Sequence, residues 1–426
     1  MTLPSAKTRD PVGWSGIVAL AFLALCLFRI GMPTRLYFDE VHYVPAARIL
    51  MEFSHITNRE HPMMGKELIA LGITLFGDNP YGWRVMSALA GTIALFGFMR
   101  AMWFASASRF ATLAFGVLLA TDFILFVHSR IAMLDIFMIL FTAIAVWMCA
   151  AAMRQPQQAR WRLAAAGVAF GLAIGTKWNA GPVALLPGIA FFTARLIAVG
   201  PRRLFSREGA PIPGISLAEA ALWLGVVPAL TYALSFWPVA FYEKDPLTIA
   251  GFIPYQEKMW AMQESTIKPH PYMSRWYHWV IDWRAIWYFY EKFDGAQRGV
   301  LMVGNPLTML AGLPALLWCA FVGIFRRNWA ALGAACFYLM ALGMWIIAPK
   351  PVQFYYHYML PSCFLMGALA LALDMFYRHG KAGKWIAFGT LGLSCALFAA
   401  FYPILAATPL EGPQSFLHWA WLKSWR

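Results

Sequence analysis

Two neighbouring carboxylates, Asp39 and Glu40, follow directly on the first long apolar run of the sequence, within the segment YFDEVHY (residues 37–43). A carboxylate at the boundary between membrane and water is poorly solvated, which is unfavourable unless another group pairs with it or a reaction uses it. Partial desolvation also raises the basicity of a carboxylate, as a general base acting on a hydroxyl requires. Taken alone, the pair fits a catalytic base and ordinary loop charges equally well.

Two cations follow on the same side of the predicted membrane. Lys66 ends the segment HPMMGK and Arg84 ends the segment FGDNPYGWR. A phosphate group would satisfy both. For Lys66 the alternative is snorkelling to lipid headgroups, and this alternative is weaker for Arg84, which lies just inside an apolar run.

A further acid, Asp135, ends the segment HSRIAMLD and begins an apolar run. A helix N-terminus would favour its negative charge there, and ionisable residues at membrane depth are functional candidates. A structural ion pair with Arg84, Arg130 or Lys177 is an equally good interpretation.

Aromatic rings alternate with Arg and His in the segment HPYMSRWYHW (residues 270–279). Such a surface suits stacking on a sugar or docking of a peptide, and it is equally typical of an interfacial aromatic belt. Near the outer ends of two late apolar runs, Lys350 and residues 353–358, which include Tyr356 and His357, are expected to face the same cavity. The candidate residues of the aromatic segment are His270, Tyr272, Arg275, Trp276 and Trp279.

The composition requires a membrane as solvent. Of the 426 residues, 61% are hydrophobic and 13% are charged, whereas a soluble domain is about half apolar and about a quarter charged. The net charge of +14 comes from short basic clusters between apolar runs, the positive-inside pattern of cytoplasmic loops and not the continuous stripe of a nucleic-acid-binding surface. The clusters are Lys7 and Arg9; Arg154, Arg160 and Arg162; Arg202, Arg203 and Arg207; Arg326 and Arg327; Arg378, Lys381 and Lys384.

A membrane-crossing helix needs about 20 mainly apolar residues, and eleven stretches meet this condition. The basic clusters place the N-terminus in the cytoplasm. Because the number of crossings is odd, residues 407–426 then lie outside as a short tail. We therefore predict an all-α polytopic protein with one transmembrane domain over residues 1–406, in which two long extracytoplasmic loops, 32–80 and 241–300, carry most of the polar candidates. The predicted spans are 13–31, 81–104, 110–128, 131–153, 163–179, 181–200, 217–240, 302–325, 329–348, 353–376 and 385–406.

The sequence resembles the bacterial protein O-mannosyltransferases, polytopic enzymes of the GT-C class of glycosyltransferases. The resemblance rests on four features, in order and on one membrane face: YFDEVHY, HPMMGK followed by FGDNPYGWR, SRIAMLD and HPYMSRWYHW. Support comes from GTKWN (175–179), GNP (304–306) and FYYHYMLP (354–361). Two departures stand out. Met63 and Met64 replace the Pro-Leu of the family's HPPLGK, and Lys350 stands where an Arg often precedes the late motif.

The resemblance implies a polyprenyl-phosphate-mannose donor and, as acceptor, a Ser or Thr hydroxyl of a protein delivered during Sec-type translocation. It implies that Asp39, with Glu40 beside it, is the catalytic base, and that attack at the anomeric carbon inverts its configuration. Arg84 would hold the donor phosphate, helped by Lys66 or Lys350. The residues expected to shape the site are His61, Arg130, Asp135 and His357.

The same resemblance implies a bacterial inner-membrane location with the active site facing the periplasm, and no cofactor beyond the lipid-linked donor. A dependence on a divalent cation stays open, although the sequence has no HExxH motif, Cys/His cluster or spaced carboxylate set, so we predict no metal site.

Two other functions remain as alternatives. One is a related GT-C transferase that moves another sugar, such as aminoarabinose, from a polyprenyl phosphate to a lipid. The other is a transporter, which the odd number of spans, the absence of inverted repeats and the placement of polar residues on one face disfavour.

Overall fold

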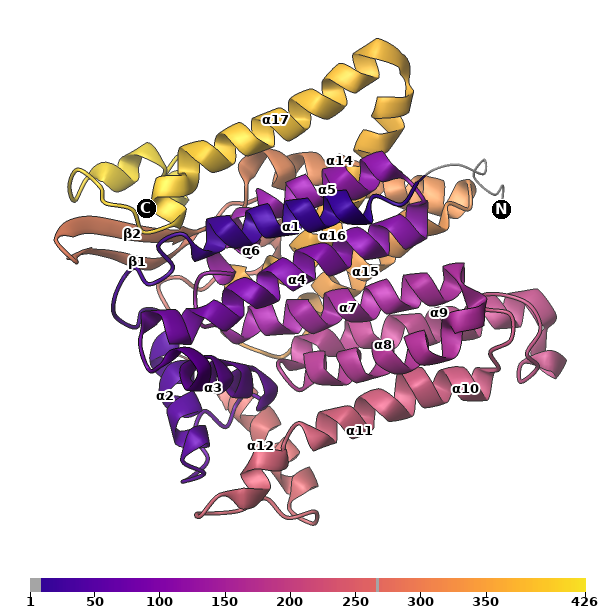
Figure 1. Cartoon of the computed structure of the whole chain (residues 1–426), viewed down its shortest axis with the longest axis horizontal. Helices are drawn as coiled ribbons and strands as arrows, with labels where there is room; N and C mark the ends of the chain where they lie inside the picture. Colours follow the sequence, from indigo (N-terminus) through magenta and orange to yellow (C-terminus); the bar gives the residue numbers. More distant parts are fainter. Residues whose placement is uncertain (1–8, 266–267) are drawn as a thin grey trace.

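Long apolar runs with few charges become helices because a helix satisfies its own backbone hydrogen bonds where water is absent. The computed structural model describes residues 9–265 and 268–426, so Lys7 of the first predicted basic cluster lies outside the described residues. A helix occupies each of the eleven predicted spans, and these helices lie roughly side by side (Figure 1). They are α1 (Val12–Leu27), α4 (Pro80–Ser106), α5 (Arg109–Ala120), α7 (Leu134–Arg154), α8 (Ala159–Ile174), α9 (Gly181–Val199), α10 (Leu217–Ala221) continuing into α11 (Val227–Leu234), α14 (Pro306–Phe325), α15 (Trp329–Ile347), α16 (Met359–Arg378) and α17 (Gly380–Leu405).

Eight helical segments of the described chain are long and apolar enough to cross a membrane, and α1 and α5 are shorter apolar helices. The segments differ in burial: 83% of the span containing α16 is buried inside the protein, against 17% of the span containing α11. On the outer helices large apolar side chains such as Leu185, Leu230 and Leu317 are exposed, as expected of surfaces that contact lipid. The chain is therefore a multi-pass membrane protein with α16 at its centre.

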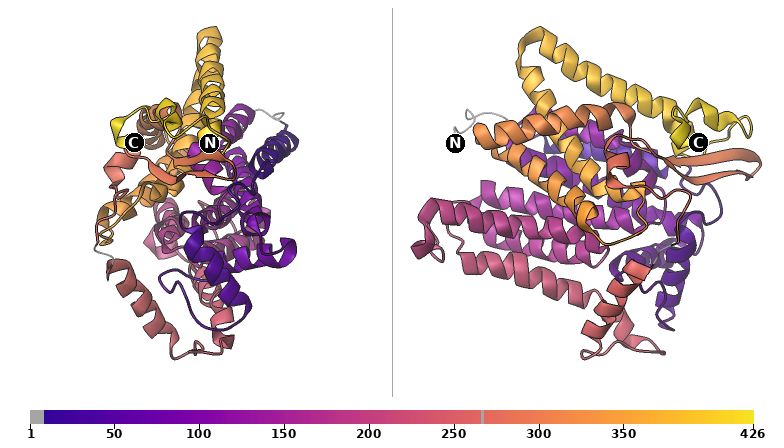
Figure 2. Two further views of the ribbon diagram at one scale, coloured as in Figure 1. Left: turned by 90° about the vertical axis from the view of Figure 1, so that its left-hand side faces the viewer. Right: turned by 180° about the vertical axis from the view of Figure 1, so that it is seen from behind.

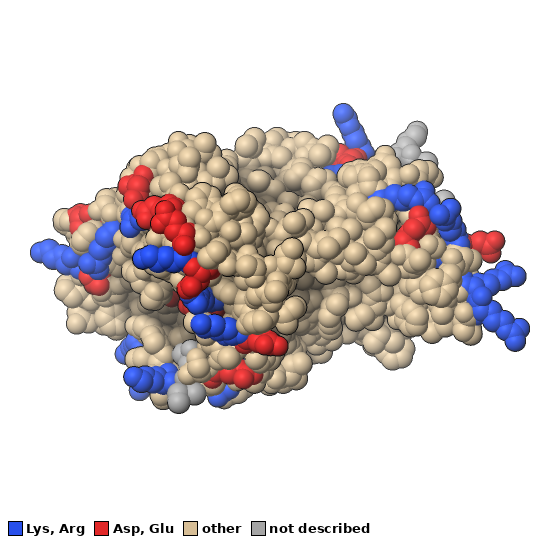
Figure 3. Space-filling view, turned by 90° about the horizontal axis from the view of Figure 1, so that it is seen from below, with Lys and Arg blue, Asp and Glu red and all other residues tan. Residues whose placement is uncertain are grey.

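Charged side chains gather toward the two ends of the molecule in the view of Figure 3, with a largely uncharged band between them. The first described residues of α1 and the C-terminus lie at opposite ends of the bundle (Figure 1).

The two long loops fold into short elements at the end of the bundle that also holds the C-terminus (Figures 1 and 2). The first loop forms two helices, as its amphipathic pattern predicts, and main-chain hydrogen bonds from Glu243 and Lys244 to Phe53 and Ser54 tie the two loops together. The elements are α2 (Glu40–Met51) and α3 (Met64–Phe76) from the first loop, and α12 (Phe252–Ser265), α13 (Trp276–Val280), β1 (Ile286–Phe293) and β2 (Ala296–Met302) from the second; the short α6 (Phe123–His128) follows α5.

The turn between α3 and α4 shows why the sequence FGDNP folds as it does. Asn79 caps α4 by accepting hydrogen bonds from the backbone N–H groups of Tyr81 and Gly82, and Pro80 occupies the first helical position. A Cβ atom at Gly82 would lie 1.9 Å from the carbonyl oxygen of Gly77, so only glycine allows this close approach.

The prediction of an all-α fold was wrong for residues 286–302, which form an antiparallel hairpin. Its turn residues Asp294 and Gly295 both have positive φ, 49° and 75°, the conformation that an Asp-Gly hairpin turn favours. The hairpin also holds the C-terminal tail, because Leu410 donates to the carbonyl of Gln297 and the indole of Trp287 donates to the carbonyl of Trp425.

Candidate active site

Asp39 lies at the start of α2, at the water-facing end of the bundle. Its carboxylate does not cap the helix, and it has no hydrogen-bond or ion-pair partner among residues 9–265 and 268–426. Burial raises the pKa of Asp39 to about 6; the charge of Lys177 opposes this rise and that of Asp135 adds to it. A carboxylate that is free to accept a proton, and basic enough to do so, is what a general base requires.

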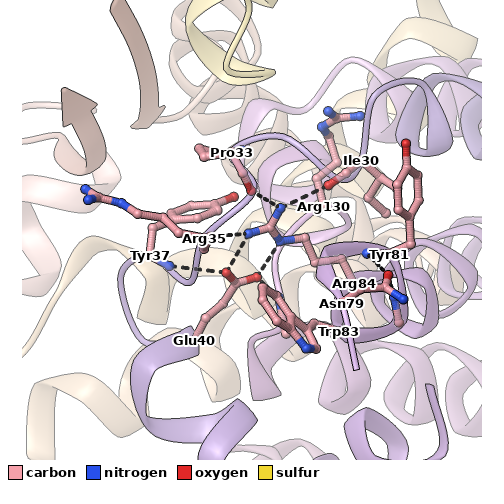
Figure 4. A network of polar contacts seen from close by, with 12 residues as sticks. Ile30, Pro33, Arg35, Tyr37, Glu40, Asn79, Tyr81, Trp83, Arg84 and Arg130 are labelled. Carbon is pink, nitrogen blue, oxygen red and sulfur yellow. Dashed lines mark hydrogen bonds and ion pairs between the residues drawn. The ribbon is translucent and has the colours of Figure 1, made fainter. Parts of the chain in front are cut away.

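Glu40 differs entirely from its neighbour. It forms a bidentate ion pair with Arg84, with Nε–Oε1 and Nη2–Oε2 distances of 2.7 and 2.8 Å (Figure 4), and both side chains are fully buried. Glu40 also accepts hydrogen bonds from the backbone N–H groups of Ala132 and Tyr37, at 2.9 and 3.3 Å. The structure thus separates the two acids: Asp39 is free and Glu40 is fully engaged.

The prediction that Arg84 holds the donor phosphate is contradicted by its surroundings. The N–H groups that do not contact Glu40 donate to main-chain carbonyls of the loop after α1 (Figure 4), so the five N–H donors of the guanidinium are all used. A phosphate could reach Arg84 only by breaking this network. The three acceptors are the carbonyls of Ile30 at 3.1 Å, Pro33 at 2.8 Å and Arg35 at 2.9 Å.

Lys66 is likewise not placed to bind a phosphate. Its ammonium donates to the carbonyls of Asn58 and His61, at 2.6 and 3.0 Å, and the side chain is fully buried. Burial lowers the pKa of Lys66 to about 7. The residue therefore fixes the loop that carries His61, whose own pKa burial lowers well below its usual value.

Arg130 is a structural residue of the same kind. Its guanidinium reaches the C-terminal end of α1 and thereby holds the start of the loop that leads to Asp39. It contacts neither Asp39 nor the cavity described below. The carbonyls that it contacts belong to Leu25, Cys26, Phe28 and Arg29.

Asp135 pairs with Lys177 across a distance of 2.7 Å, and both side chains are almost completely buried. Of the three cations that the sequence allowed as partners, the fold selects this one. Lys177 also lies 5.1 Å from the ring centroid of Tyr356, so the pair reaches the wall of a cavity.

This cavity has a volume of about 440 Å³, and three of the predicted site residues line it: His61, Lys350 and His357. Lys177 and Lys350 bring two positive charges to its wall, where Glu60 and Glu264 also lie, and the ammonium of Lys350 donates to Oε1 of Gln263 at 2.8 Å. Burial, followed by repulsion from Lys177, lowers the pKa of Lys350 to about 8. The wall also contains the side chains of Trp178, Trp260, Trp345 and Tyr356.

Cations surrounded by aromatic rings suit a sugar phosphate, because ammonium groups pair with phosphate oxygens and aromatic faces pack on sugar rings. His357 belongs to this wall: its Nδ1 accepts from the backbone N–H of Phe354 at 3.0 Å, and its ring lies 3.8 Å from that of Trp345. Tyr356 lines the cavity as the sequence predicted, whereas sequence reasoning missed Lys177 and Gln263 as cavity residues, although GTKWN had marked the segment of Lys177.

The aromatic segment 270–279 does not gather at one site. His270 and Arg275 are exposed, while Tyr272 lines a separate groove. The prediction that Trp279 docks a ligand was wrong, because its side chain is fully buried and donates to Ser274 at 2.8 Å. Trp276 packs partly buried against the core, and Trp279 supports the cavity from behind through an edge-to-face contact with Trp345.

Within the described parts of the chain there is no group of three or more His, Cys, Asp or Glu residues placed to hold a metal ion. The chemistry available from this chain's own side chains is proton acceptance by Asp39 and charge neutralisation by the two lysines.

A multi-pass helical bundle with an unpaired carboxylate near a cavity of lysines and aromatic rings fits the class of membrane-embedded glycosyltransferases, and comparison with known proteins supports this class. Residues 77–241 match the family model described as dolichyl-phosphate-mannose-protein mannosyltransferase. Residues 248–425 match the model of the C-terminal four-helix membrane region of protein O-mannosyltransferases. The chain belongs to the protein O-mannosyltransferase family.

Three similar proteins illustrate the relationship. A polyprenol-phosphate-mannose–protein mannosyltransferase of Mycolicibacterium smegmatis is 26% identical, over 97% of this chain and 93% of its own length. The Saccharomyces cerevisiae Pmt1-Pmt2 complex bound to the sugar donor has a chain with a TM-score of 0.84 at 13% identity, covering 98% of this chain and 93% of that one. ArnT of Cupriavidus metallidurans bound to undecaprenyl phosphate has a TM-score of 0.59 at 18% identity, covering 96% and 69%.

Proposed function

We propose that this protein transfers mannose from polyprenyl-phosphate mannose to Ser or Thr hydroxyls of other proteins, with inversion at the anomeric carbon. The proposal is supported by the family to which the chain belongs and by the activity for which its bacterial relatives are named. One observation about the site carries it: the free, partly buried carboxylate of Asp39 lies near a cavity that bears two lysines.

Asp39 and the two lysines each have one role in the proposed reaction. Asp39 accepts the proton of the acceptor hydroxyl as its oxygen attacks the anomeric carbon, and a new C–O bond forms there. The bond from that carbon to the phosphate oxygen breaks, and the lipid phosphate leaves with the electron pair. Lys350, and Lys177 through the ammonium hydrogens that do not contact Asp135, neutralise the charge that develops on the phosphate, which is the main way in which a protein accelerates such a step.

The roles of the remaining candidates follow from their contacts. The Glu40–Arg84 pair and Arg130 hold the segment before Asp39, because both arginines donate to its main-chain carbonyls. Lys66 holds the loop after α2 in the same way. All four act as positioning residues. His61 and His357 form the neutral part of the cavity wall.

The same proposal includes the topology. Eleven helices would cross the bacterial inner membrane with the N-terminus in the cytoplasm, and Asp39 would face the periplasm. The basic clusters between the helices support this orientation. An acceptor polypeptide emerging from Sec-type translocation would then meet the site from the water-filled side, and the donor would enter from the lipid.

Incubation of membranes containing the protein with radiolabelled polyprenyl-phosphate mannose and a Ser/Thr peptide tests the function directly. We expect label on the peptide. The alternative of sugar transfer to a lipid, to which the likeness to ArnT lends some weight, predicts label in the lipid fraction and none on the peptide. Solute flux into vesicles without any transfer would instead favour a transporter.

Replacement of Lys350 by Ala is expected to raise the KM for the donor roughly ten- to a hundredfold, the effect of losing one hydrogen bond to a charged group. Steady-state kinetics at saturating peptide measure this. Lys244→Ala, in an exposed position of the same outer face, is the control and should leave the donor KM unchanged. An unchanged donor KM in Lys350→Ala would remove this lysine from the phosphate site.

The dependence of kcat/KM on pH should be bell-shaped. Activity falls below about pH 6 because Asp39 becomes protonated and can no longer accept a proton. It falls above about pH 8 because Lys350 loses its positive charge. In Lys350→Arg the guanidinium stays charged, so we expect the alkaline limb to move to higher pH while the acidic limb stays in place; an alkaline limb that does not move contradicts the assignment.

A further inference from the structure

A second hollow lies next to Asp39. It is a groove of about 530 Å³ between the segment before α2 and strand β1. Phe38 lines this groove, Tyr356 lines the lysine-bearing cavity, and the two rings meet edge to face at 6.0 Å. The ring of Phe38, with Asp39 as the next residue, therefore separates the two hollows.

The groove follows the edge of β1. Five consecutive strand residues, Trp287 to Glu291, line it. Trp287 and Phe289 pair with consecutive residues of β2, so Tyr288 is bulged and the side chains do not alternate regularly there. The groove contacts residues on both sides of this bulge and thus follows the length of β1. β1 pairs with β2 on its other side, and no other described segment makes main-chain hydrogen bonds to β1.

The opposite wall is formed by residues 35–38 and Val41, which are held against the hairpin by side chains (Figure 4 shows Arg35 and Tyr37). Arg35 pairs with Glu291 across the groove, and the ring of Tyr37 meets that of Phe289 at 5.8 Å. The rings of Phe38 and Tyr288, stacked at 3.8 Å, are a third contact between the two walls. The main-chain groups on this edge of β1 have no main-chain partner among the described residues, and aromatic rings with an exposed ion pair lie along the groove.

An inverting displacement needs the attacking oxygen and the leaving phosphate on opposite sides of the anomeric carbon. If the phosphate lies at Lys177 and Lys350, the acceptor hydroxyl must approach Asp39 from the side away from them. The groove supplies that side, because it reaches Phe38 and Val41, which flank Asp39 along the chain.

We propose that this groove binds the acceptor as an extended polypeptide, which pairs with the free edge of β1 and presents its Ser or Thr hydroxyl to Asp39. The proposal rests on the proposed function and adds the site and conformation of the acceptor. Pairing through main-chain groups tolerates many sequences, while side-chain pockets add preference. The exposed Arg35–Glu291 pair makes the groove unsuited to an acyl chain, since apolar chains do not compensate desolvated charges.

Two substitutions in the groove and two matched controls test this proposal. Val41→Trp fills the groove from the first turn of α2, where the native side chain is 47% exposed, and Tyr272→Ala removes an aromatic wall. Leu71→Trp, at a 43% exposed position on α3, and Tyr277→Ala, at a 50% exposed position on α13, are outside both hollows. We expect the groove variants to raise the KM for the peptide on the order of tenfold, as loss of a packed anchor does, with the donor KM unchanged and the controls like wild type.

A set of acceptor peptides, each carrying one N-methyl group, tests the extended conformation separately. Along a paired strand, the N–H groups that face the partner occur at every second residue. We expect methylation at alternate positions to raise the peptide KM and methylation at the positions between them to have little effect. A KM that is insensitive to every N-methyl group would exclude pairing with β1.

The outcomes separate this inference from the proposed function. If the wild-type protein labels the peptide but Val41→Trp and Tyr272→Ala keep the wild-type peptide KM, the groove is not the acceptor site and the proposed function stands. A rise in donor KM instead of peptide KM would assign the groove to the donor and overturn the proposal. If the wild type labels no peptide at all, the proposed function fails, and this inference fails with it.

Discussion

Replacement of Asp39 by Asn is expected to reduce transfer of mannose roughly 100- to 10,000-fold, the contribution typical of a general base. The amide has nearly the shape of the carboxylate but cannot accept the proton of the hydroxyl. The native carboxylate makes no hydrogen bond or ion pair to any described residue, so the substitution breaks no contact. Transfer of label from polyprenyl-phosphate mannose to a peptide measures the loss.

The same variant should be at least as stable as the wild type at neutral pH. Burial raises the pKa of Asp39 from 3.8 to about 6, so the folded state disfavours its ionised form. The stability that the protonated form contributes is fully present below about pH 4 and is lost as the pH rises through about 6. Asn avoids this loss, and a melting temperature equal to or above that of the wild type would exclude misfolding as the cause of inactivity.

The control for this experiment is Asp245→Asn, which changes an 82% exposed side chain on the same outer face. It should retain full activity. Normal mannosylation by Asp39→Asn would end the assignment of Asp39 as the base, and a large drop in its melting temperature would show that the carboxylate has a structural role instead.

Replacement of Arg84 by Met is expected to destabilise the protein by about 3–5 kcal/mol, because it leaves the buried charge of Glu40 without a partner. Three main-chain carbonyls of the loop after α1 also lose their donors. We expect a lower melting temperature and little folded protein in detergent. A phosphate-binding Arg84 would behave differently: the variant would melt like the wild type and show only a raised donor KM.

Two further variants sharpen this test. Arg48→Met breaks the half-exposed pair with Asp78 and should change stability by no more than about 1 kcal/mol. The double variant Glu40→Leu with Arg84→Met removes both buried charges and should recover part of the lost stability. A double variant less stable than Arg84→Met alone would contradict the ion pair as the source of the effect.

The helices and the motif-bearing loops could be predicted from the sequence because their signals are local. Apolar runs of about 20 residues indicate spans without any knowledge of neighbours, and a helix formed in each predicted range. The hairpin at residues 286–302 was also encoded locally, in Asp294-Gly295 between aromatic and apolar runs. It was missed because the membrane pattern led us to expect helices only.

The roles of the charged residues could not be predicted in the same way. Arg84 and Lys66 have the residue types and sequence positions of phosphate ligands, but both are held by other groups of the protein. Lys177 was one of three cations that the sequence allowed as a partner of Asp135, and only the structure selects it. Which donors stay free depends on carbonyl groups and carboxylates that lie far away in the sequence, such as Glu40 for Arg84 and Asp135 for Lys177.

The pair Asp39-Glu40 shows the difference between what the sequence determines and what the tertiary structure decides. By itself the sequence determined a multi-pass membrane protein of the protein O-mannosyltransferase family, with an acidic pair at the start of its first outer loop. Only the tertiary structure decided that Glu40 is bound to Arg84 while Asp39 remains free beside a lysine-lined cavity. The physical reason is that local sequence fixes hydrophobicity and backbone conformation, whereas the pairing and desolvation of a charge are set by the groups that folding brings around it.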